Sequence, residues 1–193
     1  MNVVLSWDLF VLAFFVVIIA YSFIIGRDNT LKVILGTYVA ILAADAVGAL
    51  FGQYFAGSEI FLKVLQGAAV NNDQEAVIFV KVMVFIVFLI LFAVRGAFYV
   101  DTSEEDSSLM RMVLTFLYGV LSAGLIVSAI LTFISGVAFI GGGSVETTKT
   151  ALWDIYNQSE VIRTMVQYTY LWFSIPALAF LLHSLHTHKV EAV

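Results

Sequence analysis

Residues 31–55 read LKVILGTYVAILAADAVGALFGQYF, a mostly apolar stretch with an acidic residue, Asp45, near its middle. A helix of this length rises about 37 Å, more than the hydrocarbon core of a bilayer, which is about 30 Å thick. Small residues occupy every fourth position of the stretch: Gly36, Ala40, Ala44, Gly48 and Gly52. Such a row lets a second membrane helix approach closely. We therefore expect a transmembrane helix with one small-residue face.

The composition of the whole chain is that of a membrane protein. Of its 193 residues, 62% are hydrophobic and 12% are charged, and the mean hydropathy is +1.02. A soluble domain carries roughly twice that charged fraction. The formal net charge of −5 provides no basic surface for a phosphate backbone, so we expect no nucleic-acid partner. Because the chain has no cysteine, disulfides, thiolate nucleophiles and cysteine-bound metals are excluded.

Further apolar runs cover residues 7–25, 76–100, 109–139 and 165–182. We therefore expect an all-α, polytopic transmembrane bundle of four or five helices. Residues 1–140 form a four-helix core, residues 141–164 a Gly-rich hinge and an interfacial amphipathic helix, and residues 165–193 a fifth transmembrane helix with a short polar tail. The last run is short and contains Pro176, so a helix lying along the membrane is the alternative to a fifth span.

The distribution of lysine and arginine indicates an orientation. With the N-terminus outside, the cytoplasmic side carries Arg27, Lys32, Arg95, Arg111 and Lys189, and the outer side carries Lys63, Lys81, Lys149 and Arg163. Arg27 and Lys32 lie in the shortest loop, where the positive-inside rule works best. We therefore expect the N-terminus to lie outside.

A second row of small residues lies in the run 109–139 and consists of Gly124, Ser128, Thr132 and Gly136, with Gly119 and Ala123 beside it. We expect this helix and the helix of residues 31–55 to form the packed centre, with the bulkier runs 7–25 and 76–100 nearer the lipid. The run is too long for one crossing and is expected to project beyond the bilayer or to break at Gly136. The two small-residue faces serve packing within the chain or, alternatively, contact with a second copy or a membrane-protein partner.

Asp45 is the one acidic residue deep within an apolar run, where it costs about 2.5–3.5 kcal/mol on insertion scales. It therefore needs a partner. Lys81, inside the same end of the next helix, is one candidate, and a protonated Asp45 bonded to Tyr38, Ser122 or Ser128 is the other. In function, Asp45 is either a proton or cation site or a satisfied structural contact.

Other polar residues give weaker signals. Asp8 is expected to be a helix N-terminal charge, and Glu104, Glu105 and Asp106 a solvated connector, with a cation or a basic partner as its alternative ligand. His183 and His186 are three residues apart but have no carboxylate beside them, so we expect no metal. No catalytic motif and no cofactor-binding pattern is recognisable, so we expect no enzymatic activity and no cofactor.

The order of these features resembles the CvpA-like (colicin V production protein) family. The resemblance covers residues 7–133 and rests on IIGRDNTLK at 24–32 and on MVLTFLYGVLSAGLIVSAILTF at 112–133. The chain departs from the family in having Gly26-Arg27 where an Arg-Gly pair is usual, and Ser122 where the fourth helix carries a basic residue. The resemblance implies a multi-pass protein of the bacterial cytoplasmic (inner) membrane, without catalytic residues, linked to toxin biosynthesis, small-protein export or envelope maintenance.

Three functions follow as hypotheses. The first is a non-enzymatic, CvpA-like protein in envelope maintenance or export, surrounded by membrane lipids and working in a homo-oligomer or with a membrane-protein partner. The second is a small transporter or channel that uses Asp45 as an intramembrane proton or cation site. The third is the membrane subunit of a larger enzyme.

Overall fold

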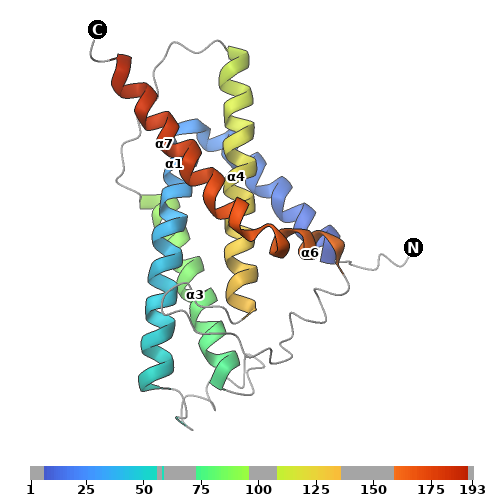
Figure 1. Cartoon of the computed structure of the whole chain (residues 1–193), viewed down its shortest axis with the longest axis vertical. Helices are drawn as coiled ribbons and strands as arrows, with labels where there is room; N and C mark the ends of the chain where they lie inside the picture. Colours follow the sequence, from blue (N-terminus) through green and yellow to red (C-terminus); the bar gives the residue numbers. More distant parts are fainter. Residues whose placement is uncertain (1–6, 56–57, 59–72, 96–107, 136–158, 191–193) are drawn as a thin grey trace.

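The computed structural model describes residues 7–55, 58, 73–95, 108–135 and 159–190, and this part of the chain is all-helical, with no strand (Figure 1). Its helices are α1 (Trp7–Tyr54), α3 (Asp73–Arg95), α4 (Ser108–Ile134), α6 (Glu160–Gln167) and α7 (Thr169–Val190). The expected all-α class is confirmed. The helices α1, α3 and α4 are long and apolar enough to cross a membrane, and α6 with α7 would add one more if the bent pair forms a single span.

Helix α1 consists of two helical halves joined at Gly26. Gly26 has φ 82° and ψ 172°, a left-handed conformation that glycine adopts without steric cost. The Thr30 hydroxyl donates a hydrogen bond of 2.8 Å to the Gly26 carbonyl and so holds the start of the second half. Figure 1 shows the first half running obliquely and the second half running along the long axis of the bundle. The short loop expected between the apolar runs 7–25 and 31–55 is therefore a sharp bend at one glycine.

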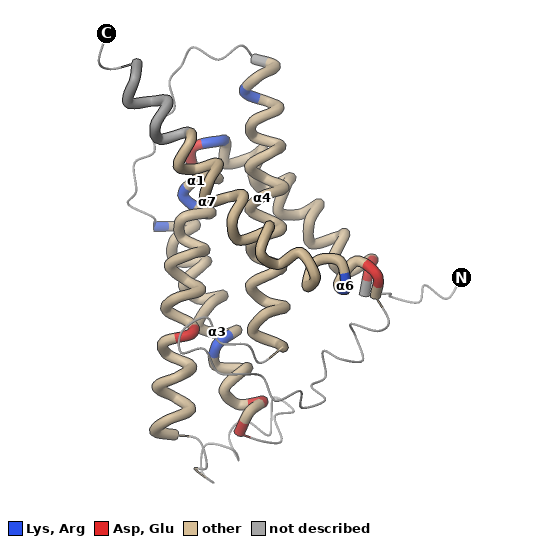
Figure 2. The backbone as a smooth tube through the Cα atoms, viewed as in Figure 1, with Lys and Arg blue, Asp and Glu red and all other residues tan. Residues whose placement is uncertain are grey.

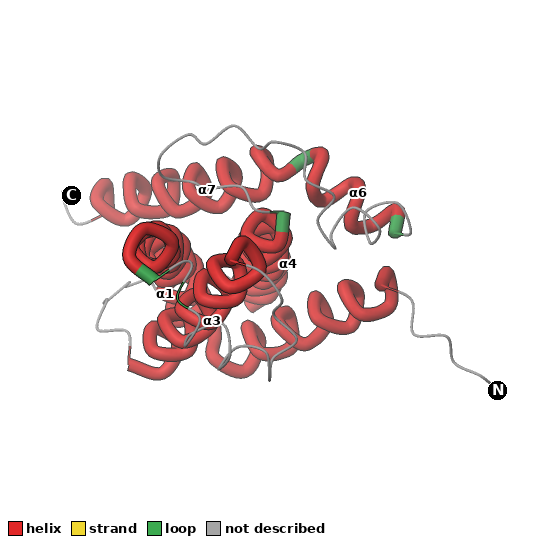
Figure 3. Tube along the Cα trace, turned by 90° about the horizontal axis from the view of Figure 1, so that it is seen from below, coloured by secondary structure: helices red, strands yellow, loops and turns green. Residues whose placement is uncertain are grey.

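Helix α4 is the most buried helix of the bundle. In its most apolar 18-residue stretch, 72% of the residues are buried, against 11% for α3 and for α1. Seen end-on, α7 covers one side of α4, and α3 and the first half of α1 lie on the other (Figure 3). The expectation that the fourth run lies centrally and the third nearer the lipid agrees with this arrangement.

The main core joins the second half of α1 to α4. Its buried members are Leu31, Val33, Ile34, Ala40, Ile41, Ala44, Phe85, Tyr118, Leu121, Leu125, Ile126, Ala129 and Phe133. Phe85 of α3 meets Phe133 of α4 edge to face, with 5.7 Å between the ring centroids. This geometry is one that aromatic pairs prefer, and it ties α3 to the same core.

Helices α6 and α7 form a pair bent by 60°. We expected the change from amphipathic helix to final helix after residue 164, and the structure has its bend at Tyr168, the C-cap of α6. Ile162 and Met165 of α6 are buried against Val11, Val127 and Leu131. The Gly-rich hinge at 141–143, Gly136 and the first part of the expected amphipathic helix lie outside the described residues.

Charge differs between the two ends of the bundle. Arg27, Lys32, Arg95 and Arg111 lie at the end where α1 bends, which we call the Gly26 end, whereas α3 begins at the opposite end with Asp73 and Glu75 (Figure 2). We call this opposite end, where the second half of α1 also finishes, the Tyr54 end. The separation matches the grouping expected from the sequence for the basic residues of the first loop.

Candidate functional site

Asp45 of α1 forms an ion pair with Lys81 of α3 inside the bundle. The Lys81 ammonium donates a hydrogen bond to Asp45 Oδ1, with 2.5 Å between Nζ and Oδ1. The two side chains are exposed by only 1% for Asp45 and 9% for Lys81. Of the two arrangements expected from the sequence, the structure therefore has the one in which Lys81 is the partner.

Gly48 makes room for the lysine stem. It lies three residues after Asp45 and so on the same face of α1. A methyl group on Gly48 would lie 2.7 Å from Lys81 Cε, closer than real side-chain atoms approach one another. The absence of a side chain at Gly48 therefore lets Lys81 cross the face of α1 and reach the carboxylate. A small residue that looks like a helix-packing position thus also shapes the polar site.

The ion pair lies deep inside the bundle, so each of its two charges needs the other to be stable there. Nine residues separate Asp45 from Tyr54, so the carboxylate lies about 13 Å inside α1. A carboxylate or ammonium at this depth is costly unless it is paired. Removing one partner would leave the other charge buried, which makes the pair a constraint on how α1 and α3 pack together.

The hydroxyls considered as alternative partners of Asp45 have other positions. Tyr38 donates to the Phe173 carbonyl of α7 over 2.5 Å. Ser122 and Ser128 of α4 are each 1% exposed, and their hydroxyls have no hydrogen-bond partner among the described residues. Ser122 lines an apolar cavity of about 300 Å³ between the first half of α1, α3 and α4. The expectation that either serine could hold a protonated Asp45 is therefore wrong for this structure.

The glycines of the two small-residue rows face different neighbours. On the second half of α1, Gly36 lies against Phe92 of α3, and Gly52 is in ordinary contact with Val77 of α3. On α4, Gly124 lies under the ring of Trp172 of α7.

The helices that carry the two rows share the main core, as expected, but their glycines do not face one another. Gly119 of α4 is close to Ser22 in the first half of α1, so the α4 glycines do not meet the glycines of the second half. The physical reason is size: Gly36, Gly48 and Gly124 accommodate the large or long side chains of Phe92, Lys81 and Trp172, which come from α3 and α7. Ala40 and Ala44 are fully buried, and the described glycines serve packing within the chain.

Two polar contacts between helices were not predicted from the sequence. Asp8 accepts a hydrogen bond from the Ser159 hydroxyl over 2.5 Å and another from the backbone N–H of Val161 over 3.4 Å. Ser159 is also the N-cap of α6, since its side chain accepts from the Ile162 N–H. Asp8 therefore stabilises the start of α6, not only of its own helix. Serine is a common residue at the start of a helix, so the sequence offers a signal for Ser159 as a cap. It offers none for the contact of Ser159 with Asp8, which is 151 residues away.

The second unpredicted contact is the bond from Tyr38 to Phe173, which lies in the turn of α7 before Pro176. Proline disrupts the hydrogen bonding of the preceding helical turn, and in membranes such turns are supported by neighbouring helices. Helix α1 thus makes polar contacts with α3, with α7 and with the start of α6. Its two halves hold the other helices in place.

The described residues show a structural site more clearly than a reactive one. They contain no group of three or more His, Cys, Asp or Glu side chains that could hold a metal ion. The acidic connector at Glu104, Glu105 and Asp106 and the side chains of His183 and His186 lie outside what the structure describes. The geometry provides a buried ion pair, Asp45 with Lys81, which can fix α1 and α3 to each other. The pair can take up or release a proton only if it opens.

Comparison of the chain with protein-family models, curated proteins and solved structures gives no match. The CvpA-like resemblance over residues 7–133 therefore stays a prediction.

Proposed function

We propose that the chain is a non-enzymatic, multi-pass protein of the bacterial cytoplasmic membrane, in which the Asp45–Lys81 ion pair is a structural link between α1 and α3. The observation that carries the proposal is the burial of both charged groups, with side-chain exposures of 1% and 9%, in direct contact. A proton or cation site needs access from an aqueous phase, whereas this pair is closed by the stem of Lys81 lying against Gly48.

Helix lengths support several membrane crossings. The 48 residues of α1 would extend about 70 Å if straight, more than twice the hydrocarbon thickness, and the helix bends at Gly26. Each half of α1 then provides one crossing, α3 and α4 provide one each, and the bent pair α6 and α7 provides the fifth. In this arrangement the basic Gly26 end faces the cytoplasm and the N-terminus lies outside.

The cellular role we propose is envelope maintenance or export of small proteins, as the CvpA-like resemblance implies. We also propose that the protein works in a homo-oligomer or with a membrane-protein partner. Gly36, Gly48 and Gly124 are covered by Phe92, Lys81 and Trp172, so an assembly would use the bulky exposed side chains of the helices instead. Cross-linking in membranes with native mass spectrometry in mild detergent tests this part, and a monomer in both would contradict it.

A transport assay tests the structural role against the transporter alternative. Purified wild-type protein and the Asp45→Asn variant are reconstituted into proteoliposomes, and proton flux is followed with an internal pH dye. We expect no flux above that of empty liposomes for either protein. Flux by the wild type that Asp45→Asn abolishes, while Asp73→Asn at the exposed start of α3 leaves it intact, would establish the transporter instead.

A further inference from the structure

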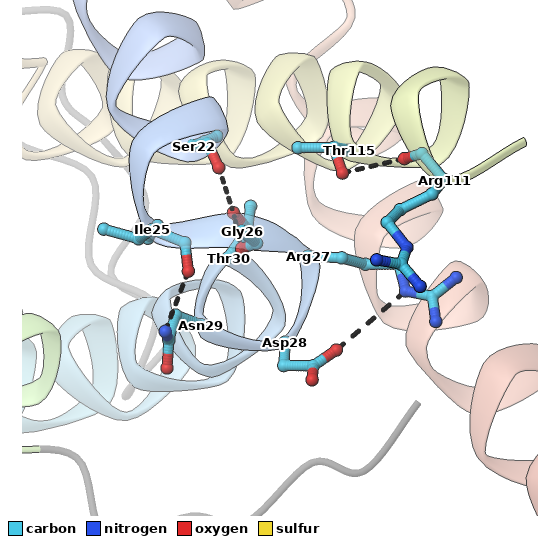
Figure 4. A network of polar contacts seen from close by, with 9 residues as sticks. All are labelled: Ser22, Ile25, Gly26, Arg27, Asp28, Asn29, Thr30, Arg111 and Thr115. Carbon is cyan, nitrogen blue, oxygen red and sulfur yellow. Dashed lines mark hydrogen bonds and ion pairs between the residues drawn. The ribbon is translucent and has the colours of Figure 1, made fainter. Parts of the chain in front are cut away.

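Two arginines from different helices converge at the Gly26 end. Arg27 follows the bend of α1, and Arg111 belongs to the first turn of α4. Figure 4 shows their side chains pointing toward one another, with the guanidinium groups side by side. Arg27 is 7% exposed and its place is set by the bend, whereas Arg111 is exposed. The Arg27 guanidinium is thus buried within the bundle, and the Arg111 side chain extends toward it from the surface.

Positive charge exceeds negative charge around this pair. The described ionisable side chains at the Gly26 end are Arg27, Lys32, Arg95 and Arg111 against the single carboxylate of Asp28. Asp28 Oδ1 lies 3.9 Å from Arg27 Nε, and its side chain is 45% exposed. A separation of 3.9 Å is too long for a hydrogen bond between these two atoms. Guanidinium groups stay protonated, so the convergence of two of them is favourable when an anion lies against both.

The chemistry of the pair points to phosphate. A guanidinium presents a planar set of N–H donors that matches the oxygens of a phosphate, and two of them can hold one phosphate from two sides. Apolar side chains surround the position of Arg111: Leu109, Met112 and Val113 of α4 are 77%, 62% and 61% exposed. A ligand that joins a phosphate to long hydrocarbon chains fits both features.

We propose that Arg27 and Arg111 bind the phosphate of an anionic phospholipid at the Gly26 end. The inference rests on the membrane placement proposed above, in which this end lies at the level of the lipid headgroups. Basic pockets between membrane helices on the cytoplasmic side are where such headgroups bind. The lipid would join the bend of α1 to the start of α4.

Lipid retention tests the proposal. Protein purified into nanodiscs containing equal amounts of phosphatidylglycerol and phosphatidylcholine is transferred to mild detergent, and the lipid that stays bound is measured by native mass spectrometry. We expect the wild type to retain phosphatidylglycerol preferentially. Arg111→Gln should lower this retention about tenfold or more, because a hydrogen bond to a charged group is lost. Arg95→Gln, which removes the same charge at the same end, should change it less than twofold.

Further variants and conditions separate the alternatives. Equal losses for Arg111→Gln and Arg95→Gln would overturn the site in favour of general attraction to the surface. Protection from thermal unfolding by inorganic phosphate alone, without lipid preference, would overturn the lipid and identify a soluble anion.

Two controls keep the outcome clear. An unchanged unfolding temperature of Arg111→Gln in phosphatidylcholine shows that the variant is folded, and Arg111→Lys should retain an intermediate amount of lipid, because it keeps the charge but loses the planar donor set. Carbonate extraction of the wild type tests the membrane placement separately. A protein that resists extraction but shows no lipid preference would contradict this inference and leave the proposed function standing.

Discussion

At the scale of single residues, glycine has two roles in this chain. Gly26 permits a backbone conformation, with φ at 82°, and so allows α1 to bend. Gly36, Gly48 and Gly124 provide space for Phe92, Lys81 and Trp172. In a membrane the hydrophobic effect does not drive helices together, so such close packing contributes much of the stability.

The contact between Gly124 and Trp172 gives the sharpest prediction at this scale. A methyl group at residue 124 would lie 2.8 Å from Trp172 Cδ2 and closer still to two other ring atoms. The indole is rigid and also contacts Phe15, with 6.1 Å between ring centroids. We expect Gly124→Ala to lower the unfolding free energy by about 1–3 kcal/mol through overpacking, measured by reversible unfolding in mixed micelles.

Gly52→Ala is the matched control, because its new methyl group would make an ordinary contact of 3.4 Å with Val77. We expect a change within about 0.5 kcal/mol. Equal effects of the two substitutions would mean that helix propensity, and not the fit of Trp172, decides the outcome.

At the scale of helices, a few polar contacts join α1 to its neighbours. The Tyr38 hydroxyl donates to the Phe173 carbonyl of α7. Tyr38→Phe removes this bond and keeps the ring, so we expect a loss of about 1 kcal/mol and faster hydrogen exchange in the turn before Pro176. Tyr54→Phe is the control, because Tyr54 is 71% exposed. No change in exchange on Tyr38→Phe would contradict the role assigned to this bond.

The start of α6 depends on Ser159, which caps the helix and also bonds to Asp8. We expect Ser159→Ala to cost about 1–2 kcal/mol and to increase hydrogen exchange throughout α6. Thr164→Ala, which removes only an exposed bond to the Glu160 carbonyl, is the comparison. If both variants exchange alike, α6 is held by Ile162 and Met165 instead of by its cap.

Helix type and the central place of α4 could be predicted from the sequence because apolar runs and small residues report directly on burial. Lys81 could be predicted as a partner of Asp45 because few groups can balance a buried carboxylate. The partner of each glycine could not be predicted, since the rows at Gly36–Gly52 and Gly119–Gly136 show that something packs closely but not which side chain. The contact of Asp8 with Ser159 depends on tertiary folding alone.

At the scale of the whole molecule, the proposed membrane crossings place the Gly26 end and the Tyr54 end on opposite sides of the membrane. The chain has no cysteine, so single cysteines introduced at Asn29 and Gln74 report on these ends without background. Both residues are exposed. We expect a membrane-impermeant maleimide, added to intact cells, to label Gln74→Cys and to label Asn29→Cys only after the cytoplasmic membrane is opened. Labelling of both in intact cells would contradict the proposed crossings.

The packing of the whole bundle also depends on the ion pair. Asp45 lies on α1, and Lys81 lies on α3, the helix that packs against the glycines of the second half of α1. If the pair is a structural link, the two charges must be coupled in stability. If each group acts alone, their removal should have independent effects.

A double-mutant cycle at Asp45 and Lys81 measures whether the two charges stabilise the bundle as a pair. The unfolding free energies of wild type, Asp45→Asn, Lys81→Met and the double variant are measured in mixed micelles, with Lys32→Met as the control for losing a lysine that is only partly buried. We expect each single change at the pair to cost about 3–5 kcal/mol, because a buried charge loses its partner, and the double variant to be clearly more stable than the sum predicts. Small and additive single effects would contradict a structural ion pair.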